Sequence, residues 1–320
     1  MTDHHHHHSD EHQHCCCHHD GAAESHPVSK YEQALAHYDC AVDESAVRQA
    51  VEAIVAERVP ANTTPEVLRF LFGSIELTSL RCTDNDESII RFTDKVNDFA
   101  HAYAALPHVA TICVYPCFAA AVSNTLTVDG VGIACVAGSF PSSQALIEVK
   151  IAETALAIKD GATEIDIVQP VGKYLAGNYE ELCDDISELK NACGTVPLKV
   201  ILETGCLPSL SDVKKASLLA MYSGADYIKT STGKEKVAAT PAAAYVMCTA
   251  IKEFYDATGI QVGFKPAGGI NTVADAVTYY SIVQAVLGDK WLTNKWLRLG
   301  TSRLANVLLS DIVGRPTTFF

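Results

Sequence analysis

Ala225-Asp226-Tyr227-Ile228-Lys229-Thr230-Ser231-Thr232-Gly233-Lys234 places a lysine in a short β-type run, and Thr, Ser and Gly residues follow it at once. This pattern predicts that Lys229 ends a strand and that its amine is partly desolvated. A second lysine, Lys265, has a similar setting in Gly263-Phe264-Lys265-Pro266-Ala267-Gly268-Gly269-Ile270. Two lysines at the ends of neighbouring strands lower each other's pKa, because like charges disfavour the protonated form. A lysine whose pKa falls from about 10.4 to roughly 7–8 offers a free amine that attacks carbonyl groups. The pair therefore predicts a Schiff-base enzyme.

Strand-like runs alternate with helical runs eight times along the chain. Near-continuous apolar strands, each followed by a helix, are typical of a parallel sheet that is covered on its outer face. Eight such units predict an α/β fold, a closed (β/α)8 TIM barrel. The expected strands are 70–78, 109–115, 131–137, 164–168, 197–203, 226–230, 261–266 and 296–301.

The N-terminal region has two parts. Residues 1–28 are expected to form a disordered tail rich in His and Cys, with ten of the thirteen histidines and three cysteines. The tail is either a metal-binding extension or an expression tag on a native tail that meets metal adventitiously, and it lacks paired zinc-type cysteine spacing. Residues 29–320 are expected to form one barrel domain. This domain includes a helical stretch from Ser29 to Arg58, capped near Asp43, that plugs the bottom of the barrel or covers its side.

Charge and composition exclude several classes of function. A formal net charge of −14 argues against a nucleic-acid groove and against an anionic membrane surface. Apolar runs stay below 18 residues, and the first residues lack an apolar signal core, so a soluble cytoplasmic protein is expected. Most of the twelve cysteines lie in apolar runs, which predicts free thiols rather than disulfides. Oligomeric state stays open, with a homo-oligomer among the expectations.

Charged residues interrupt four of the apolar strand runs. They are Asp166, Lys199, Lys229 and Lys265, on the fourth to seventh expected strands. A structural ion pair would explain any one of them alone, but buried charges are costly unless they face one another around a polar cavity. In such barrels the functional groups gather at the carboxyl ends of the strands. The four residues therefore predict a catalytic cluster there.

A second group of residues indicates a phosphate site. Gly268 and Gly269 follow the seventh expected strand, and Gly300 and Ser302 follow the eighth, where a helix begins. Loops at these positions bind phosphate in many barrels through backbone N–H groups and a helix N-terminus. Lys234 is expected to add a charge-assisted hydrogen bond.

The motifs resemble those of the deoxyribose-phosphate aldolase family. The resemblance runs from about residue 70 to about residue 312, and it includes Glu164-Ile165-Asp166 and Leu198-Lys199-Val200-Ile201-Leu202-Glu203-Thr204-Gly205 besides the two lysine motifs. It implies that Lys229 forms an imine with 2-deoxy-D-ribose 5-phosphate, which is cleaved reversibly to glyceraldehyde 3-phosphate and acetaldehyde. Lys265 would tune Lys229 and transfer protons together with Asp166, and Lys199, Thr78, Glu76 and Thr232 would serve the substrate or the proton relay. No metal or other cofactor is implied, because the imine acts as the electron sink.

Four positions need comment within that resemblance. Glu76 stands where the family usually has aspartate, and Arg303 stands where a second serine is common. The sequence ends in Phe319-Phe320 without the terminal tyrosine of some relatives, which puts a C-terminal role in proton transfer in doubt. Cys113 matches a pocket cysteine of some relatives, although a small apolar strand residue is its simpler interpretation.

Two other functions remain open. A transaldolase-like enzyme or another sugar-phosphate aldolase would keep the lysines and change the pocket wall. A non-enzymatic barrel with a metal-binding tail would bind metal tightly and form no borohydride adduct.

Overall fold

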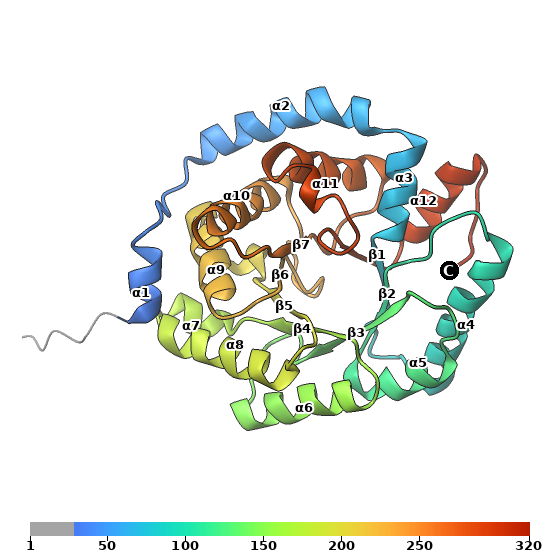
Figure 1. Ribbon diagram of the computed structural model, residues 1–320, viewed down its shortest axis with the longest axis horizontal. Coiled ribbons are helices and arrows are strands. Elements are labelled where there is room, and N and C mark those ends of the chain that lie inside the picture. Colours follow the sequence, from blue (N-terminus) through green and yellow to red (C-terminus); the bar gives the residue numbers. More distant parts are fainter. Residues whose placement is uncertain (1–28) are drawn as a thin grey trace, which may run out of the picture.

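The computed structural model describes residues 29–320, which form a barrel of parallel strands surrounded by helices (Figure 1). The strands pair in the order β7-β6-β5-β4-β3-β2-β1-β8, and every pairing is parallel. Two parallel bridges, Phe264 with Leu297 and Ala267 with Gly300, link β7 to the β8 side and bring the barrel close to closure. The predicted TIM-barrel fold is confirmed. The strands are β1 (Ile75–Thr78), β2 (Thr111–Val114), β3 (Gly132–Ala137), β4 (Glu164–Val168), β5 (Leu198–Ile201), β6 (Tyr227–Lys229), β7 (Gly263–Lys265) and β8 (Leu299–Thr301).

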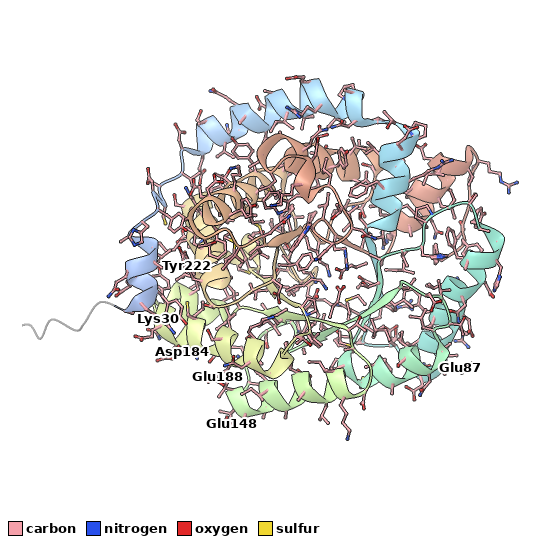
Figure 2. All side chains as sticks on the ribbon, in the orientation of Figure 1. Lys30, Glu87, Glu148, Asp184, Glu188 and Tyr222 are labelled. Atoms are coloured by element: carbon pink, nitrogen blue, oxygen red, sulfur yellow. The ribbon has the colours of Figure 1, made fainter. Side chains whose placement is uncertain are left out.

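Helices form the outer layer, and their ends follow capping rules. Ser209 caps α9 by accepting the Asp212 N–H, and Gly224 follows that helix with a left-handed φ of 101°. Figure 2 shows acidic side chains such as Glu87, Glu148 and Asp184 on the outer helices, so part of the net negative charge faces solvent. The helices are α1 (Lys30–Leu35), α2 (Glu44–Asn62), α3 (Pro65–Gly73), α4 (Asp86–Ala102), α5 (Ala119–Thr125), α6 (Ile147–Lys159), α7 (Val171–Leu175), α8 (Tyr179–Cys193), α9 (Leu210–Tyr222), α10 (Pro241–Thr258), α11 (Val273–Val286) and α12 (Leu304–Val313).

The region before β1 differs from the sequence prediction. The first expected strand, 70–78, is wrong for residues 70–73, which belong to α3. Thr64 caps this helix and Pro65 occupies its first turn, so its apolar residues recur at helical spacing rather than along a strand. The helical stretch expected from Ser29 to Arg58 is divided into α1 and α2, and Asp43 caps α2 by accepting the Ser45 and Ala46 N–H groups.

Helix α2 covers the side of the barrel, which was one of the two expected positions. Figure 1 shows α2 outside α10 and α11. Asn62 at the end of α2 donates hydrogen bonds to Ser281 Oγ and Gln284 Oε1 on α11, both at 2.9 Å. The N-terminal helices therefore form an additional layer and contribute no residue to the interior of the barrel.

The C-terminal residues pack in the outer layer. The Phe320 ring lies 5.3 Å from that of Phe99 on α4 and 6.3 Å from that of Phe72 on α3, measured between centroids. Asn306 Oδ1 accepts the backbone N–H groups of Phe319 and Phe320 at 2.8 and 3.0 Å. These contacts hold the aromatic end against α3, α4 and α12, on the outside of the barrel.

Three further sequence predictions concern the N-terminal tail, membrane-spanning helices and the state of the cysteines. The predictions for the tail, residues 1–28, lie outside the described residues. None of the helices in residues 29–320 combines the length and the apolar composition of a membrane-spanning segment. The cysteines of the described part are free thiols, as predicted, and they are Cys40, Cys82, Cys113, Cys117, Cys135, Cys183, Cys193, Cys206 and Cys248.

Candidate active site

Charged side chains occupy the interior of the barrel, at the carboxyl ends of β6 and β7 and deeper along β4 and β5. Lys229 is the last residue of β6, Lys265 is the last residue of β7, and the two pair in the sheet register. Asp166 on β4 pairs in the same way with Lys199 on β5. The expected position at the carboxyl ends of the strands is confirmed for Lys229 and Lys265 and is wrong for the other two, because Asp166 lies in the middle of β4 and Lys199 is the second residue of β5. Ion pairs across the interior of the barrel bring all four predicted residues together. Each is at most 4% exposed.

Asp166 is the centre of this cluster. Its Oδ2 accepts hydrogen bonds from Lys229 Nζ at 2.8 Å and from Lys265 Nζ at 2.7 Å. Its Oδ1 accepts from Lys199 Nζ at 3.0 Å. The two predicted lysines therefore lie within hydrogen-bonding distance of the same oxygen atom, and neither points to solvent.

A further set of charges lies beside the lysines. Glu76 on β1 contacts Lys265, and its Oε1 lies 3.2 Å from Lys199 Nζ. Arg298 precedes β8, and its two terminal nitrogens contact the two carboxylate oxygens of Glu164 at 3.0 and 2.9 Å. Arg298 also donates to Glu76 Oε1 at 3.1 Å. Sequence reasoning assigned no role to Arg298 or to the Glu164 side chain, although both interrupt apolar strand runs as the four predicted residues do.

This network holds more basic side chains than carboxylates. It has four basic side chains (Lys199, Lys229, Lys265, Arg298) and three carboxylates (Glu76, Glu164, Asp166), which are buried or nearly so. An unpaired buried charge is costly, and the group responds by giving up its charge. One neutral lysine brings the seven groups into balance.

Of the three lysines in the network, Lys229 is the one with a lowered pKa. Burial lowers its pKa below the usual 10.5, and the charge of Lys265 lowers it further against the opposing effect of Asp166. Burial also acts on Lys265, but Asp166 and Glu76 outweigh it and raise the pKa of Lys265 above its usual value. The pKa of Lys199 is raised in the same way, because Asp166, Glu164 and Glu76 outweigh burial.

One sequence prediction is thereby corrected. The two lysines were expected to lower each other's pKa, but only the pKa of Lys229 falls. The reason is that Lys265 contacts two carboxylates, whereas the ion pair of Lys229 is with Asp166, which it shares. Burial is also a larger cause of the Lys229 shift than the neighbouring lysine is.

Comparison with known proteins shows the family of this chain. Residues 80–291 match the DeoC/LacD family aldolase. A Caenorhabditis elegans protein, provisionally named a deoxyribose-phosphate aldolase, is 39% identical over 272 residues, which is 84% of this chain and 89% of the relative. The chain belongs to the DeoC/LacD aldolase family. The predicted resemblance is confirmed.

Other relatives of this aldolase chain carry the same name. The deoxyribose-phosphate aldolases of Mus musculus and Homo sapiens are 46% and 45% identical over 205 residues, and in both cases the match spans 63% of this chain and 63% of the relative. A structure titled as the unique tetrameric deoxyribose phosphate aldolase of Aeropyrum pernix is 24% identical, with a TM-score of 0.62 over 81% of this chain and 96% of that one. That structural likeness supports the fold.

The expected relay residues of the aldolase lie in different settings. Glu76 is fully buried in the network, where Lys199 and Lys265 outweigh the effect of burial and lower its pKa to about 2. Thr78 ends β1, and its hydroxyl donates to the Glu76 carbonyl at 2.9 Å. Thr232 lies in the loop after β6, where both its N–H and its hydroxyl contact the Glu203 carboxylate.

The expected phosphate-binding residues lie on adjacent loops, but they are not equivalent donors. The Gly300 N–H donates to the Pro266 carbonyl at 3.0 Å, and the Gly268 N–H donates to the Gly300 carbonyl at 3.3 Å. The barrel therefore uses both N–H groups, and they are poor candidates for binding phosphate. Gly269 and Ser302 are exposed at the tips of the two loops, and Lys234 is exposed in the loop after β6. The Lys234 ammonium reaches across to the Leu80 carbonyl beyond β1.

Gly300 has a different requirement, which is space. A Cβ atom built on it would lie 3.0 Å from Lys265 Cε and 2.8 Å from Ala267 Cβ. The absence of a side chain at Gly300 therefore allows Lys265 to extend to Asp166 and Glu76.

A cation is a poor fit to the carboxylates of this site. Glu76, Cys113 and Asp166 each offer a ligand atom, and these atoms lie within 4.8 Å of one another. Lysine ammonium groups already contact both carboxylates, and burial raises the pKa of the Cys113 thiol and so disfavours the thiolate. The residues present thus favour the lysine network over a bound metal.

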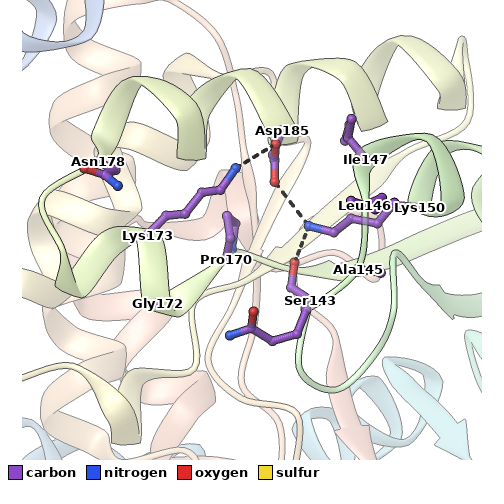
Figure 3. Close-up of a pocket in the computed structure, with 11 residues that line it drawn as sticks. Ser143, Ala145, Leu146, Ile147, Lys150, Pro170, Gly172, Lys173, Asn178 and Asp185 are labelled. Carbon is purple, nitrogen blue, oxygen red and sulfur yellow. Dashed lines mark hydrogen bonds and ion pairs between the residues drawn. The ribbon is translucent and has the colours of Figure 1, made fainter. Parts of the chain in front are cut away.

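A cavity of about 650 Å³ lies to the side of the lysine cluster, beyond β3 and β4. Figure 3 shows Lys150, Lys173, Asp185 and Ser143 pointing toward one another in its wall. Lys150 Nζ donates to Ser143 Oγ at 3.0 Å and to Asp185 at 3.1 Å, and Lys173 contacts Asp185 at 3.2 Å. Lys173 also lies 3.6 Å from Glu181, so two acidic groups face these two lysines. Lys150 lies on α6, Lys173 on α7 and Asp185 on α8, and we interpret these contacts as a structural connection between the three helices.

Ser231 is a further residue of interest that sequence reasoning left without a role. It follows Lys229 by two residues, it is fully buried, and its hydroxyl has no hydrogen-bond partner among the described residues. The signal was present in the sequence, because residues two apart in an extended run face the same side.

Replacing Gly300 with alanine should displace Lys265. The added methyl group would contact Lys265 Cε, and a displacement of about 1 Å in a catalytic group can lower a rate by about 10²-fold. Steady-state kcat of the aldolase reaction measures the effect. Gly172→Ala is the matched control, because a Cβ there would have its nearest contact at 3.5 Å. A Gly300→Ala enzyme with the kcat of the wild type would contradict this packing role.

Replacing Glu76 with glutamine should destabilise the fold. The change leaves Lys265, Lys199 and Arg298 short of a buried partner, which costs about 3–5 kcal/mol in the free energy of unfolding at pH 7. Because the pKa of Glu76 falls from 4.5 to about 2 on folding, its contribution is fully present above pH 4.5 and is lost as the pH falls toward 2. Urea unfolding at several pH values measures both effects. Glu76→Asp keeps the charge and is the control. A constant difference between wild type and Glu76→Gln down to pH 2 would contradict the assignment.

Proposed function

We propose that the chain cleaves 2-deoxy-D-ribose 5-phosphate reversibly to glyceraldehyde 3-phosphate and acetaldehyde through an imine at Lys229. Membership of the aldolase family supports this proposal. The observation that carries it is the buried amine of Lys229, whose pKa is lowered and which lies beside an ammonium group and a shared carboxylate. A neutral amine is the nucleophile that imine formation requires.

The proposed reaction proceeds through an imine and then an enamine at Lys229. The Lys229 amine adds to the C1 aldehyde of the open-chain sugar, and loss of water gives a protonated imine. The C2–C3 bond then breaks as the C3 hydroxyl loses its proton, and its electron pair moves into the imine to leave an enamine. Glyceraldehyde 3-phosphate departs. The enamine is protonated at C2, and addition of water releases acetaldehyde and regenerates the Lys229 amine.

Lys265 and Asp166 have separate tasks in this proposal. Lys265 remains an ammonium group, so it can donate a proton to the hydroxyl that leaves as water during imine formation. Three lysines hold the pKa of Asp166 well below its usual value against the effect of burial, so Asp166 remains a carboxylate. It therefore orients the lysines and accepts hydrogen bonds from a water molecule or from the C3 hydroxyl. Lys199 stabilises the Asp166 carboxylate from its other oxygen.

The sugar phosphate would bind above the mouth of the barrel. Lys234, Gly269 and Ser302 are the exposed candidates for contacts with the phosphate, and the Ser231 hydroxyl is available to a hydroxyl of the sugar. No metal or other cofactor takes part, because the protonated imine accepts the electron pair. One barrel domain over residues 29–320, a cytoplasmic location and a homo-oligomer belong to the same proposal.

Replacing Lys229 with leucine should abolish imine formation. Wild-type protein incubated with acetaldehyde and borohydride should gain one ethyl group on the peptide that contains Lys229, as read by mass spectrometry, and Lys229→Leu should gain none there. Lys173→Leu, which removes a lysine outside the cluster, is the matched control and should be labelled like the wild type. Full labelling of another lysine in Lys229→Leu would contradict the assignment.

Product analysis separates the proposed substrate from other aldolase substrates. Wild type should convert 2-deoxy-D-ribose 5-phosphate to glyceraldehyde 3-phosphate and acetaldehyde. An imine that forms while this sugar stays intact would point to a transaldolase-like or other sugar-phosphate reaction.

A further inference from the structure

Glu203 is a buried carboxylate in a strained position. It follows β5, is 3% exposed, and has a left-handed φ of 53°. A residue other than glycine in this region is strained, and it persists where the surroundings hold it in place. The Glu203 side chain has no ion pair among the described residues. Hydrogen bonds are thus the contacts that occupy its carboxylate.

Thr232 donates two hydrogen bonds to the Glu203 carboxylate. Glu203 Oε1 accepts the Thr232 N–H at 3.1 Å, and Oε2 accepts the Thr232 hydroxyl at 2.6 Å. The two residues lie on successive strand–loop connections, after β5 and after β6. A carboxylate suits this pattern because it offers two acceptor oxygens, whereas an amide offers one acceptor and one donor.

Thr232 passes this constraint to Lys234. The Thr232 hydroxyl donates one hydrogen bond to Glu203 and accepts another from the Lys234 N–H at 3.0 Å. The backbone of the turn is therefore fixed at the residue from which the Lys234 side chain extends. That side chain is exposed, and its ammonium reaches the Leu80 carbonyl on the loop after β1. The Lys234 side chain thus lies over the mouth of the barrel, while its backbone is held by Thr232, which is itself bound to the buried Glu203.

We propose that Glu203 is a positioning residue that fixes the 231–234 turn and thereby places Lys234 against the phosphate group of the substrate. This role rests on the proposed function for the identity of the substrate. The hydrogen bonds that carry it join Glu203 to Thr232 and Thr232 to Lys234, and none of them involves a lysine of the cluster. Glu203 therefore affects recognition of the phosphate rather than the chemistry at C1.

The test compares a phosphorylated with an unphosphorylated substrate. Glu203→Gln should raise KM for 2-deoxy-D-ribose 5-phosphate by roughly tenfold or more, as expected when hydrogen bonds to a charged group are lost. KM for 2-deoxy-D-ribose should change much less, and kcat should be affected less than KM. Glu235→Gln is the matched control, because this exposed acid of the same loop makes no hydrogen bond to Thr232. Equal effects on both substrates would assign Glu203 a general structural role and overturn the proposal.

Variants of Thr232 test the connection itself. Thr232→Val removes the hydroxyl and should reproduce the effect of Glu203→Gln, whereas Thr232→Ser should behave like the wild type. The Thr232→Val and Glu203→Gln changes should not add in the double variant, because both break one chain of hydrogen bonds. Fully additive effects would contradict a common action through Lys234.

Binding of inorganic phosphate reads the same site without turnover. Calorimetric titration should show phosphate binding to the wild type, and binding weaker by roughly tenfold or more in Glu203→Gln and in Lys234→Gln. If the wild type binds phosphate in this manner but cleaves no deoxyribose phosphate, the proposed function fails and the role of Glu203 stands. If phosphate binds equally to wild type and Glu203→Gln, the role of Glu203 fails.

Discussion

Two lysines sharing one carboxylate oxygen is the constraint on which the site depends. Asp166 Oδ2 accepts from both Lys229 and Lys265, so it cannot neutralise both. Glu76 adds a second carboxylate to Lys265. Burial then decides the outcome, since the lysine with the weaker compensation loses its proton more easily. The placement of carboxylates on other strands thereby holds Lys265, whose pKa is raised, beside Lys229, whose pKa is lowered, and imine formation requires a free amine.

The barrel makes this arrangement possible. Parallel strands bring residues far apart in sequence to one edge, and the closing contacts between β7 and β8 place Gly300 beside Lys265, where a larger residue would collide with it. This interior lowers the stability that burial would otherwise provide, because seven ionisable groups replace apolar side chains in the middle of the fold and must be desolvated. Arg298, which contacts Glu164 through both terminal nitrogens, keeps most of these charges paired and leaves the imbalance at Lys229. Stability and reactivity therefore depend on the same network.

Much of this could be predicted from the sequence, for physical reasons that also explain the errors. Charges that interrupt apolar strand runs have few reasons to be there, so the sequence singles out Asp166, Lys199, Lys229 and Lys265, and the structure brings these four side chains into contact. The raised pKa of Lys265 could not be found, because it depends on the combined effect of Asp166 and of Glu76, which lies 189 positions earlier in the sequence. Residues 70–73 were expected to form a strand because the period of such a short apolar run is ambiguous. The N-cap at Thr64, several residues earlier, starts the helix that includes them. The occupied N–H groups of Gly268 and Gly300 depend on the β7–β8 closure, which local sequence does not specify.

The protonation state of each lysine is the most direct test of the account. Protein labelled with ¹³C at lysine Cε, with Lys199, Lys229 and Lys265 assigned through single Lys→Arg variants, reports each amine in an NMR pH titration. The account predicts that Lys229 titrates below the usual pKa of 10.5, while Lys199 and Lys265 remain protonated above that pH. A Lys229 that stays charged as long as Lys265 does would contradict the account, since the site would then hold no free amine.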